Sequence, residues 1–174
     1  MERIDDQIIR ENIKNLTENI NFQKIKLIDL EFQANEMFAG VVPEGQLERK
    51  IGMTLVGIGA GYDQEENLTI FGDYDISIED VVKDLTLSDL NIDDGSLFLA
   101  KFKCKYRIFL ILKKEFSFAA EELNQSELWK TVINIYFQQT GKLIIFPYVR
   151  HLYDTMCKEA DFAIPVIPPI LLKS

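Results

Sequence analysis

A glycine-rich run, Gly57-Ile58-Gly59-Ala60-Gly61, is the feature of this sequence that comes nearest to a phosphate-binding loop. A dinucleotide-binding loop needs the spacing G-x-G-x-x-G where a strand passes into a helix, because these glycines let the backbone approach the phosphates. Here Tyr62 takes the place of the third glycine, and Asp63, Glu65 and Glu66 follow, whose charges would repel phosphate. We therefore interpret the run as a bulge or twist within a strand, where glycine relieves crowding.

His151 is the single histidine of the chain, and its neighbours do not complete a reactive site. Metal sites combine several His, Cys or carboxylate ligands at defined spacings, and Cys157 lies six residues further on, poorly placed for one helix face. Asp154 could reach the imidazole ring, but no serine in a strand–turn–helix setting accompanies the pair. We interpret His151 as a surface residue and predict a protein that is not an enzyme and that needs no cofactor or metal.

Two cysteines, Cys104 and Cys157, are too few for a disulfide framework. Each falls at an inward-facing position of a predicted element, as expected for buried thiols in a reducing cytosol. A disulfide between the two remains an alternative. The start, Met1 to Asp6, lacks the apolar core of a signal peptide. No window approaches the eighteen or so apolar residues of a membrane span, so we expect a cytoplasmic protein without membrane insertion.

The net charge of −9 at pH 7 argues against some classes of binding partner. Nucleic-acid phosphates are bound by clustered Lys and Arg, so this balance argues against a nucleic-acid partner. It argues equally against an anionic membrane surface.

Alternating and helical periodicities divide the 174 residues into strands followed by helices, which predicts an α+β fold in a single domain. We expect an amphipathic helix over residues 1–20, a sheet over 21–113, and helices with an apolar tail over 124–174. The predicted strands span 23–35, 48–60, 67–78 and 96–112. Residues 79–95 are acidic and are predicted to form a loop with room for one helical turn.

The strand over 96–112 has the clearest two-face pattern. Aromatic and aliphatic residues alternate with a basic row, Lys101, Lys103, Lys105 and Arg107. One face of an antiparallel sheet can stay wet, so we interpret the basic row as a solvated face opposite acidic neighbours such as Asp29 and Glu31.

Three signals place the C-terminal helices. The spacing Asn124-x-x-Glu127 predicts a capping box, and an apolar stripe from Leu128 to Phe137 follows it, with Gly141 as a stop signal. The run 143–146 is strand-like, and Pro147 then suits the first turn of a second helix. Apolar residues from Val149 to Cys157 form one stripe of that helix.

Two apolar segments are unusual for a small domain. One is the loop that contains Met37, Phe38, Val41 and Val42. The other is the proline-punctuated tail, with Ile167, Ile170 and Leu171. Either these side chains pack in the core or in a homo-oligomer interface, or part of this surface stays open to bind other chains.

The sequence resembles the SecB family of chaperones at both ends. The run Phe146-Pro147-Tyr148-Val149-Arg150 matches the family's F-P-Y-A-R at the start of its long helix. The segment from Phe162 to Pro169 is similar to the family's F-P-x-L or L-P-P-L stretch. The first strand, from Lys24 to Asn35, is similar to R-I-Y-T-K-D-I-S-F-E-A-P. The resemblance covers about residues 21–172.

This resemblance implies an ATP-independent chaperone that holds unfolded preproteins or antitoxins. It implies a four-stranded antiparallel sheet with two C-terminal helices on one face, assembled as a homotetramer that is a dimer of dimers. We expect the loop and tail residues Met37, Phe38, Val41, Val42, Ile167, Ile170 and Leu171 to bind clients. Trp129 is expected in helix–sheet or subunit packing.

The same resemblance leaves the partner open. Asp29 and Glu31 are candidates for docking the SecA motor, but Gln33 departs from the family pattern and we expect no counterpart of the family's C-terminal extension. The N-terminal helix and the lead Thr140-Gly141-Lys142 resemble the branch that accompanies toxin–antitoxin pairs. The alternatives to a chaperone are a small apolar-ligand carrier, such as a lipid carrier, and a structural assembly subunit.

Overall fold

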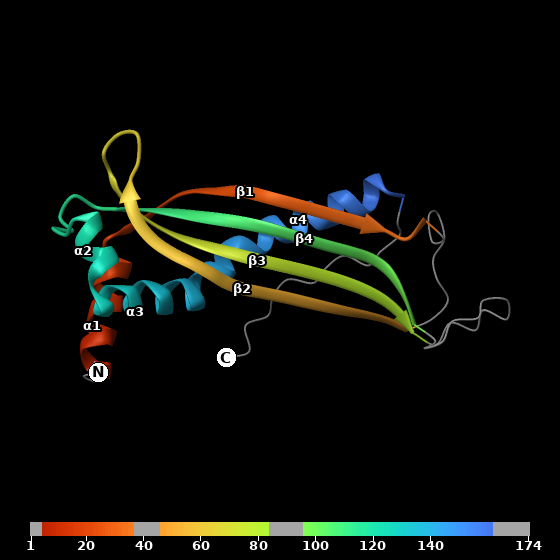
Figure 1. The fold of residues 1–174 in the computed structure, drawn as a ribbon, viewed down its shortest axis with the longest axis horizontal. Helices are drawn as coiled ribbons and strands as arrows, with labels where there is room; N and C mark the ends of the chain where they lie inside the picture. Colours follow the sequence, from red (N-terminus) through yellow and green to blue (C-terminus); the bar gives the residue numbers. More distant parts are fainter. Residues whose placement is uncertain (1–4, 37–45, 84–95, 162–174) are drawn as a thin grey trace. The chain divides into compact units, whose positions relative to one another are not determined.

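The computed structural model describes residues 5–36, 46–83 and 96–161 and has an α+β fold (Figure 1). Its four strands form one antiparallel sheet in the order β1-β4-β3-β2, which confirms the predicted fold class. In chain order the elements are α1 (Asp6–Glu18), β1 (Ile20–Ala34), β2 (Gln46–Tyr62), β3 (Leu68–Lys83), β4 (Ser96–Leu112), α2 (Ala120–Gln125), α3 (Glu127–Tyr136), the π-helical turn η2 (Phe137–Gly141) and α4 (Lys142–Glu159).

Contacts group the chain into two compact units that each take part of every strand. Unit 1 comprises Met1–Ile28, Thr54–Tyr74 and Tyr106–Ile145; unit 2 comprises Asp29–Met53, Asp75–Lys105 and Phe146–Ser174. Each unit has its own core. The predicted single-domain organisation remains a prediction.

The strand predictions differ in how well they hold. β4 has the predicted bounds, β2 extends two residues beyond its prediction at each end, and β1 begins three residues earlier and ends one residue earlier than predicted. β3 continues to Lys83, so the prediction of a loop from Glu79 is wrong for residues 79–83. Alternation persists there despite the acidic side chains, because Asp80 is buried with polar partners and Glu79 pairs across the sheet with Lys101 at 3.0 Å. The rest of the predicted loop lies outside the described residues.

The core of unit 1 is built by one face of β3 and β4 against α1 and α3. Ile70, Tyr74, Ile108 and Leu110 are buried, together with Leu16 of α1. The Tyr74 hydroxyl donates a 2.6 Å hydrogen bond to the carbonyl of Phe137. This bond ties the end of α3 to the sheet.

Trp129 closes the other end of unit 1. It is 5% exposed and packs edge-on against Phe116 and Phe118, with ring centroids 5.3 and 4.9 Å away. Its described ring contacts are therefore with the connection between β4 and α2 of its own chain, and the expected helix–sheet or subunit packing remains a prediction.

The core of unit 2 contains both cysteines. Cys104 of β4 and Cys157 of α4 are buried free thiols, as predicted, beside the buried Phe102, Val149 and Tyr153. Phe102 and Tyr153 meet edge-to-face at 5.6 Å. Burial raises the pKa of the Cys104 thiol to about 12 and that of Cys157 to about 11.

The capping prediction at Asn124 is wrong. Ser126 is the N-cap of α3 and accepts a hydrogen bond from the Trp129 amide at 3.3 Å. The residues before it form the short helix α2, where the Glu122 carboxylate accepts from the Ala119 amide at 2.9 Å. A serine two residues after the asparagine offered a second cap of the same chemistry, and the Asn124 side chain bonds to β2 instead.

Gly141 does not stop the helix, and residues 143–146 are helical instead of strand-like. The chain passes from α3 through η2 directly into α4, which contains Pro147. Burial explains the helix, since Ile145, Phe146 and Val149 are buried while Leu143 is exposed. That spacing is helical. A π turn accommodates one extra residue, and Gly141 fits there because a Cβ would collide with the Tyr74 hydroxyl.

The positions of the β2 glycines show that the register of β2 against β3 shifts by one residue. A Cβ at Gly52 would meet Ser77, whereas a Cβ at Gly57 would meet Asp73 and one at Gly59 the ring of Phe71. From Gly52 to Gly57 the chain of β2 advances five residues, whereas from Ser77 to Asp73 the facing chain of β3 covers only four. β2 therefore contains a β-bulge between Gly52 and Gly57, just before the run for which the sequence predicted one. Gly59 itself leaves room for the Phe71 ring.

Candidate functional site

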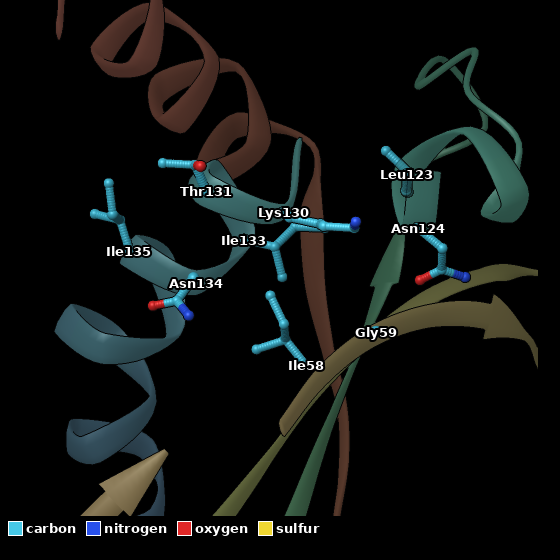
Figure 2. A pocket seen from close by; sticks show the side chains of 9 residues that line it. All are labelled: Ile58, Gly59, Leu123, Asn124, Lys130, Thr131, Ile133, Asn134 and Ile135. Carbon is cyan, nitrogen blue, oxygen red and sulfur yellow. The ribbon is translucent and has the colours of Figure 1, made fainter. Parts of the chain in front are cut away.

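The client-binding residues predicted from sequence do not fall in the described part of the chain. Met37, Phe38, Val41 and Val42 of the loop lie outside it, as do Ile167, Ile170 and Leu171 of the tail. Their role remains a prediction. Among several hollows lined by described residues, we take as the candidate site an open one in unit 1, on the surface between β2, α2 and α3 (Figure 2).

This unit-1 hollow has a volume of about 430 Å³. Its lining residues are Ile58, Gly59, Leu123, Asn124, Lys130, Thr131, Ile133, Asn134 and Ile135. Ile58 of β2 and Ile133 of α3 point toward one another in Figure 2. Four of the nine lining residues, Ile58, Leu123, Ile133 and Ile135, are aliphatic, so part of the wall suits an apolar side chain.

The rim of the unit-1 hollow is polar but electrically neutral. The Lys130 ammonium lies 2.7 Å from the Glu127 carboxylate, so its charge is paired. The Thr131 hydroxyl donates to the Glu127 carbonyl at 2.8 Å. Within the described residues the Asn134 side chain makes no hydrogen bond. The hollow thus offers an aliphatic floor, a free amide and little net charge.

Asn124 joins α2 to the edge of the sheet. Its side-chain oxygen accepts from the Ala60 amide and its side-chain nitrogen donates to the Ala60 carbonyl, both at 2.9 Å. An amide side chain thus takes the two bonds that a neighbouring strand would make. Sequence reasoning assigned Asn124 to a helix cap. Asn124 and Ala60 are 64 residues apart, and no local pattern links them.

A row of ion pairs lies on the solvent-exposed face of the sheet. Nitrogen–oxygen distances are 3.0 Å for Lys101–Glu79, 3.4 Å for Lys105–Asp75 and 2.6 Å for Arg107–Asp73. Lys103 lies 3.9 Å from Glu31. The basic row therefore faces acidic residues, as predicted, but these lie mainly on β3, and of the two residues named in the prediction only Glu31 is in a described ion pair. Arg107 forms a two-pronged bond with Asp73 that raises the pKa of its guanidinium.

The two predicted docking residues lie on β1 in unit 2. Asp29 and Glu31 are both exposed. The Asp29 carboxylate accepts a 2.9 Å bond from the Leu30 amide, and Glu31 is only loosely paired. Both carboxylates are accessible to a partner. The basic row beside them on β4 makes this face mixed in charge instead of uniformly acidic.

A buried polar cluster holds three elements of unit 2 together. Asp80 is 0% exposed and accepts two bonds from Arg49 at 2.6 and 2.7 Å and one from the Tyr153 hydroxyl at 2.7 Å. Burial alone would lower the pKa of Arg49, but the bonds and charge of Asp80 outweigh it and raise that pKa. Burial, reinforced by the Asp80 charge, raises the pKa of Tyr153. These three hydrogen bonds connect β2, β3 and α4.

His151 is exposed, as predicted, and Asp154 lies 3.9 Å from Arg150. Over residues 5–36, 46–83 and 96–161, no three His, Cys, Asp or Glu side chains are grouped to hold a metal ion. In the same ranges no helix has the length and apolar content to cross a membrane.

Comparison with known proteins gives a structural likeness without a sequence match. No family model matches the chain, and no curated protein matches it. Among solved structures it is similar to a SecB-like chaperone of Mycobacterium tuberculosis in complex with a ChAD peptide from the HigA1 antitoxin. The TM-score is 0.63 at 10% sequence identity, over 94% of this chain and 99% of the other. The chain therefore has a SecB-like fold.

Proposed function

We propose that this protein is an ATP-independent chaperone that holds unfolded or aggregation-prone polypeptides. The observation that carries the proposal is the SecB-like fold, which extends over 94% of the chain. The mycobacterial protein of that fold is bound to a peptide of an antitoxin. An antitoxin-type segment is accordingly the client class that we favour for this chain, ahead of preproteins handed to SecA.

Exposed apolar surface supports this proposal. Unit 1 exposes Val56 by 49%, and unit 2 exposes Tyr148 by 50% and Ile51 by 44%. Each methylene group that a client buries contributes about 0.8 kcal/mol. Several such weak sites on one assembly act together through effective concentration. Apolar contacts of this kind recognise composition and flexibility instead of one folded shape.

The client-binding residues proposed here are those of the loop and the tail. Met37, Phe38, Val41 and Val42 would form one apolar site, and Ile167, Ile170 and Leu171 another. We place the protein in the cytoplasm as a homotetramer. Asp29 and Glu31, exposed on β1, would dock a basic partner surface.

Light scattering of an unfolding client tests this function. An aggregation-prone enzyme is diluted from denaturant into buffer with the protein and without nucleotide. We expect scattering to fall as the chaperone approaches stoichiometric amounts. The double variant Phe38→Asp/Val42→Asp should lose most of this suppression. Undiminished suppression by that variant would show that the loop assignment is wrong, and no suppression by the unmodified protein would refute the function.

A matched control separates apolar loss from added charge. Gln138 and Gln139 are exposed, so Gln138→Asp/Gln139→Asp adds the same two charges without removing apolar surface. This control should suppress aggregation as well as the unmodified protein does. Equal damage by both double variants would assign the effect to charge.

A further inference from the structure

β2 lies at one edge of the sheet, so its outward backbone groups decide what can pair there. In an antiparallel strand, the N–H and C=O of one residue point to the neighbouring strand and those of the next residue point away from it. At the β2–β3 turn the Asp63 amide donates to the Asn67 carbonyl at 3.1 Å. Odd-numbered residues here therefore face β3.

Ala60 fits this alternation, because both its backbone groups turn outward to the Asn124 amide. Two residues earlier, Ile58 must also present its N–H and C=O outward. The bulge lies before Gly57 and does not disturb the alternation between Ile58 and Ala60. Ile58 is at the same time a lining residue of the unit-1 hollow. An outward donor and acceptor therefore stand beside an aliphatic depression.

We infer that the β2 edge at Ile58 receives an extended, uncharged segment of an unfolded polypeptide as an added strand, with one apolar side chain in the unit-1 hollow. This inference rests on the proposed function and names the way in which a client is held. Backbone pairing recognises any extended chain, and the aliphatic floor selects an apolar residue. The neutral rim, with Lys130 already paired to Glu127, favours a segment without charge.

Asn124 limits where the added strand can lie. It already satisfies Ala60, so the guest strand ends before that residue unless it displaces the asparagine. The bulge before Gly57 bends the strand on the other side. The pairing window is therefore short and centred on Ile58. A short window suits weak, reversible holding better than the long unbroken edge that leads to aggregation.

Two blocked peptides of alternating valine and serine test the pairing. They have the same side chains, and the second is N-methylated at every residue, which removes its backbone donors. In fluorescence anisotropy we expect the unmethylated peptide to bind about tenfold more tightly, as one or two backbone hydrogen bonds allow. Equal affinities overturn the strand addition and leave the proposed function intact. That function is tested separately by aggregation suppression.

Hydrogen exchange at single amides locates the site in the unmodified protein. Without peptide, the Ile58 amide should exchange fast and the Ala60 amide slowly. Saturating unmethylated peptide should slow Ile58 at least tenfold, and the methylated peptide should not. An Ile58 amide that is unaffected by bound peptide overturns the inference. Protection that appears without peptide and grows with protein concentration assigns the edge to a second copy of the chain, and overturns it as well.

Substitutions at Ile58 separate its backbone from its side chain. Where the N–H of an edge-strand residue points outward, proline can replace that residue without breaking the hydrogen bonds between β2 and β3. Ile58→Pro removes this donor but keeps the outward carbonyl that accepts from the peptide, so it should reduce the difference between the two peptides without abolishing it. Ile58→Ala keeps the N–H and should weaken both peptides while it preserves their tenfold ratio. A preserved ratio in Ile58→Pro would contradict the inference.

Discussion

Asp80 joins three elements of unit 2, namely β2, β3 and α4. It is fully buried, and Arg49 and Tyr153 supply all three of the bonds described for its carboxylate. A buried charge is tolerated when it is paired and hydrogen-bonded, and removal of one partner leaves the other uncompensated. The net attraction within the cluster therefore adds little to the stability of the fold, but removal of one of its members should lower that stability strongly.

We predict that Asp80→Ala lowers the free energy of unfolding by about 3–5 kcal/mol, because the partly buried Arg49 guanidinium and the buried Tyr153 hydroxyl both lose the carboxylate to which they donate. Urea denaturation followed by circular dichroism measures this change. Asp75→Ala is the matched control, since Asp75 pairs with Lys105 on the exposed face. The control should cost less than about 1 kcal/mol. Equal losses in the two variants would show that the buried cluster has no special role.

Because the two thiols are buried, we expect the free energy of unfolding to decrease at alkaline pH. The folded-state pKa values of Cys104 and Cys157 are raised to about 12 and about 11, from 9.0 for a free thiol. Folding thus favours the protonated thiols. Their contribution is complete below pH 9 and is lost as the pH rises toward the folded-state values.

We expect stability to fall above pH 9 by at most about 1.4 kcal/mol per pH unit for each thiol. Buried Tyr74, Tyr136 and Tyr153, whose pKa values are also raised, act in the same direction at higher pH. Urea midpoints between pH 8 and pH 11 measure the fall. At pH 8 an aromatic disulfide reagent should titrate both thiols only after unfolding. Rapid reaction in the native state would contradict their burial.

At the scale of single residues, local sequence signals predicted isolated properties and missed pairings. The exposure of His151 and the burial of Cys104 and Cys157 followed from their positions in periodic patterns. The bonds of Asn124 to Ala60, and of Asp80 to Arg49 and Tyr153, link residues that no local pattern connects. Such pairings depend on the tertiary fold and left no signal in the sequence alone.

Among the elements, β4 was the most predictable because a strict two-residue alternation over seventeen residues has few other interpretations. The continuous passage from α3 to α4 was the least predictable. Gly141 and Pro147 are both helix-ending signals, yet contacts with the sheet outweigh them. Tyr74 occupies the space beside Gly141, and buried positions 145, 146 and 149 continue the helical spacing.

Glycine at position 141 provides a test at this scale. In an ordinary helix, replacement of glycine by alanine stabilises by about 0.5–1 kcal/mol. Here the new Cβ would collide with the Tyr74 hydroxyl and disturb its bond to Phe137. We predict that Gly141→Ala instead destabilises by about 1–3 kcal/mol, measured by thermal or urea unfolding.

Gly61 supplies the matched control, because a Cβ there meets no atom within 4 Å. Gly61→Ala should change stability by less than about 0.5 kcal/mol. Stabilisation by Gly141→Ala would mean that the contact with Tyr74 does not restrict η2.

For the whole molecule, the sequence resemblance to SecB at the two ends of the chain correctly anticipated the fold. It did so although only 10% of residues are identical to the structural neighbour. The first-strand motif from Lys24 to Asn35 and the run Phe146–Arg150, which lies inside α4, carried that information. The client-binding segments could not be located, because the loop and tail that contain them lie outside the described residues. The apolar hollow beside β2 was not anticipated, since it is built from three separate segments.

Exposed apolar residues on β1 bear on assembly. Phe22, Leu27 and Ile28 are 50%, 39% and 45% exposed, on a strand at the edge of the sheet. We predict a homotetramer in which these side chains are covered, and Leu27→Asp/Ile28→Asp should shift sedimentation toward smaller species. Gln33→Asp, on the same strand and exposed, should leave the assembly unchanged. A monomer at all concentrations would contradict the predicted assembly.

The central claim is that this protein binds polypeptides because they are unfolded. Isothermal titration with reduced, carboxymethylated α-lactalbumin, which stays unfolded, and with the native form of the same protein tests this claim most directly. We predict heat of binding and a stable complex with the unfolded form, without nucleotide, and none with the native form. Absence of binding to the unfolded form, or equal binding to both, would contradict the account.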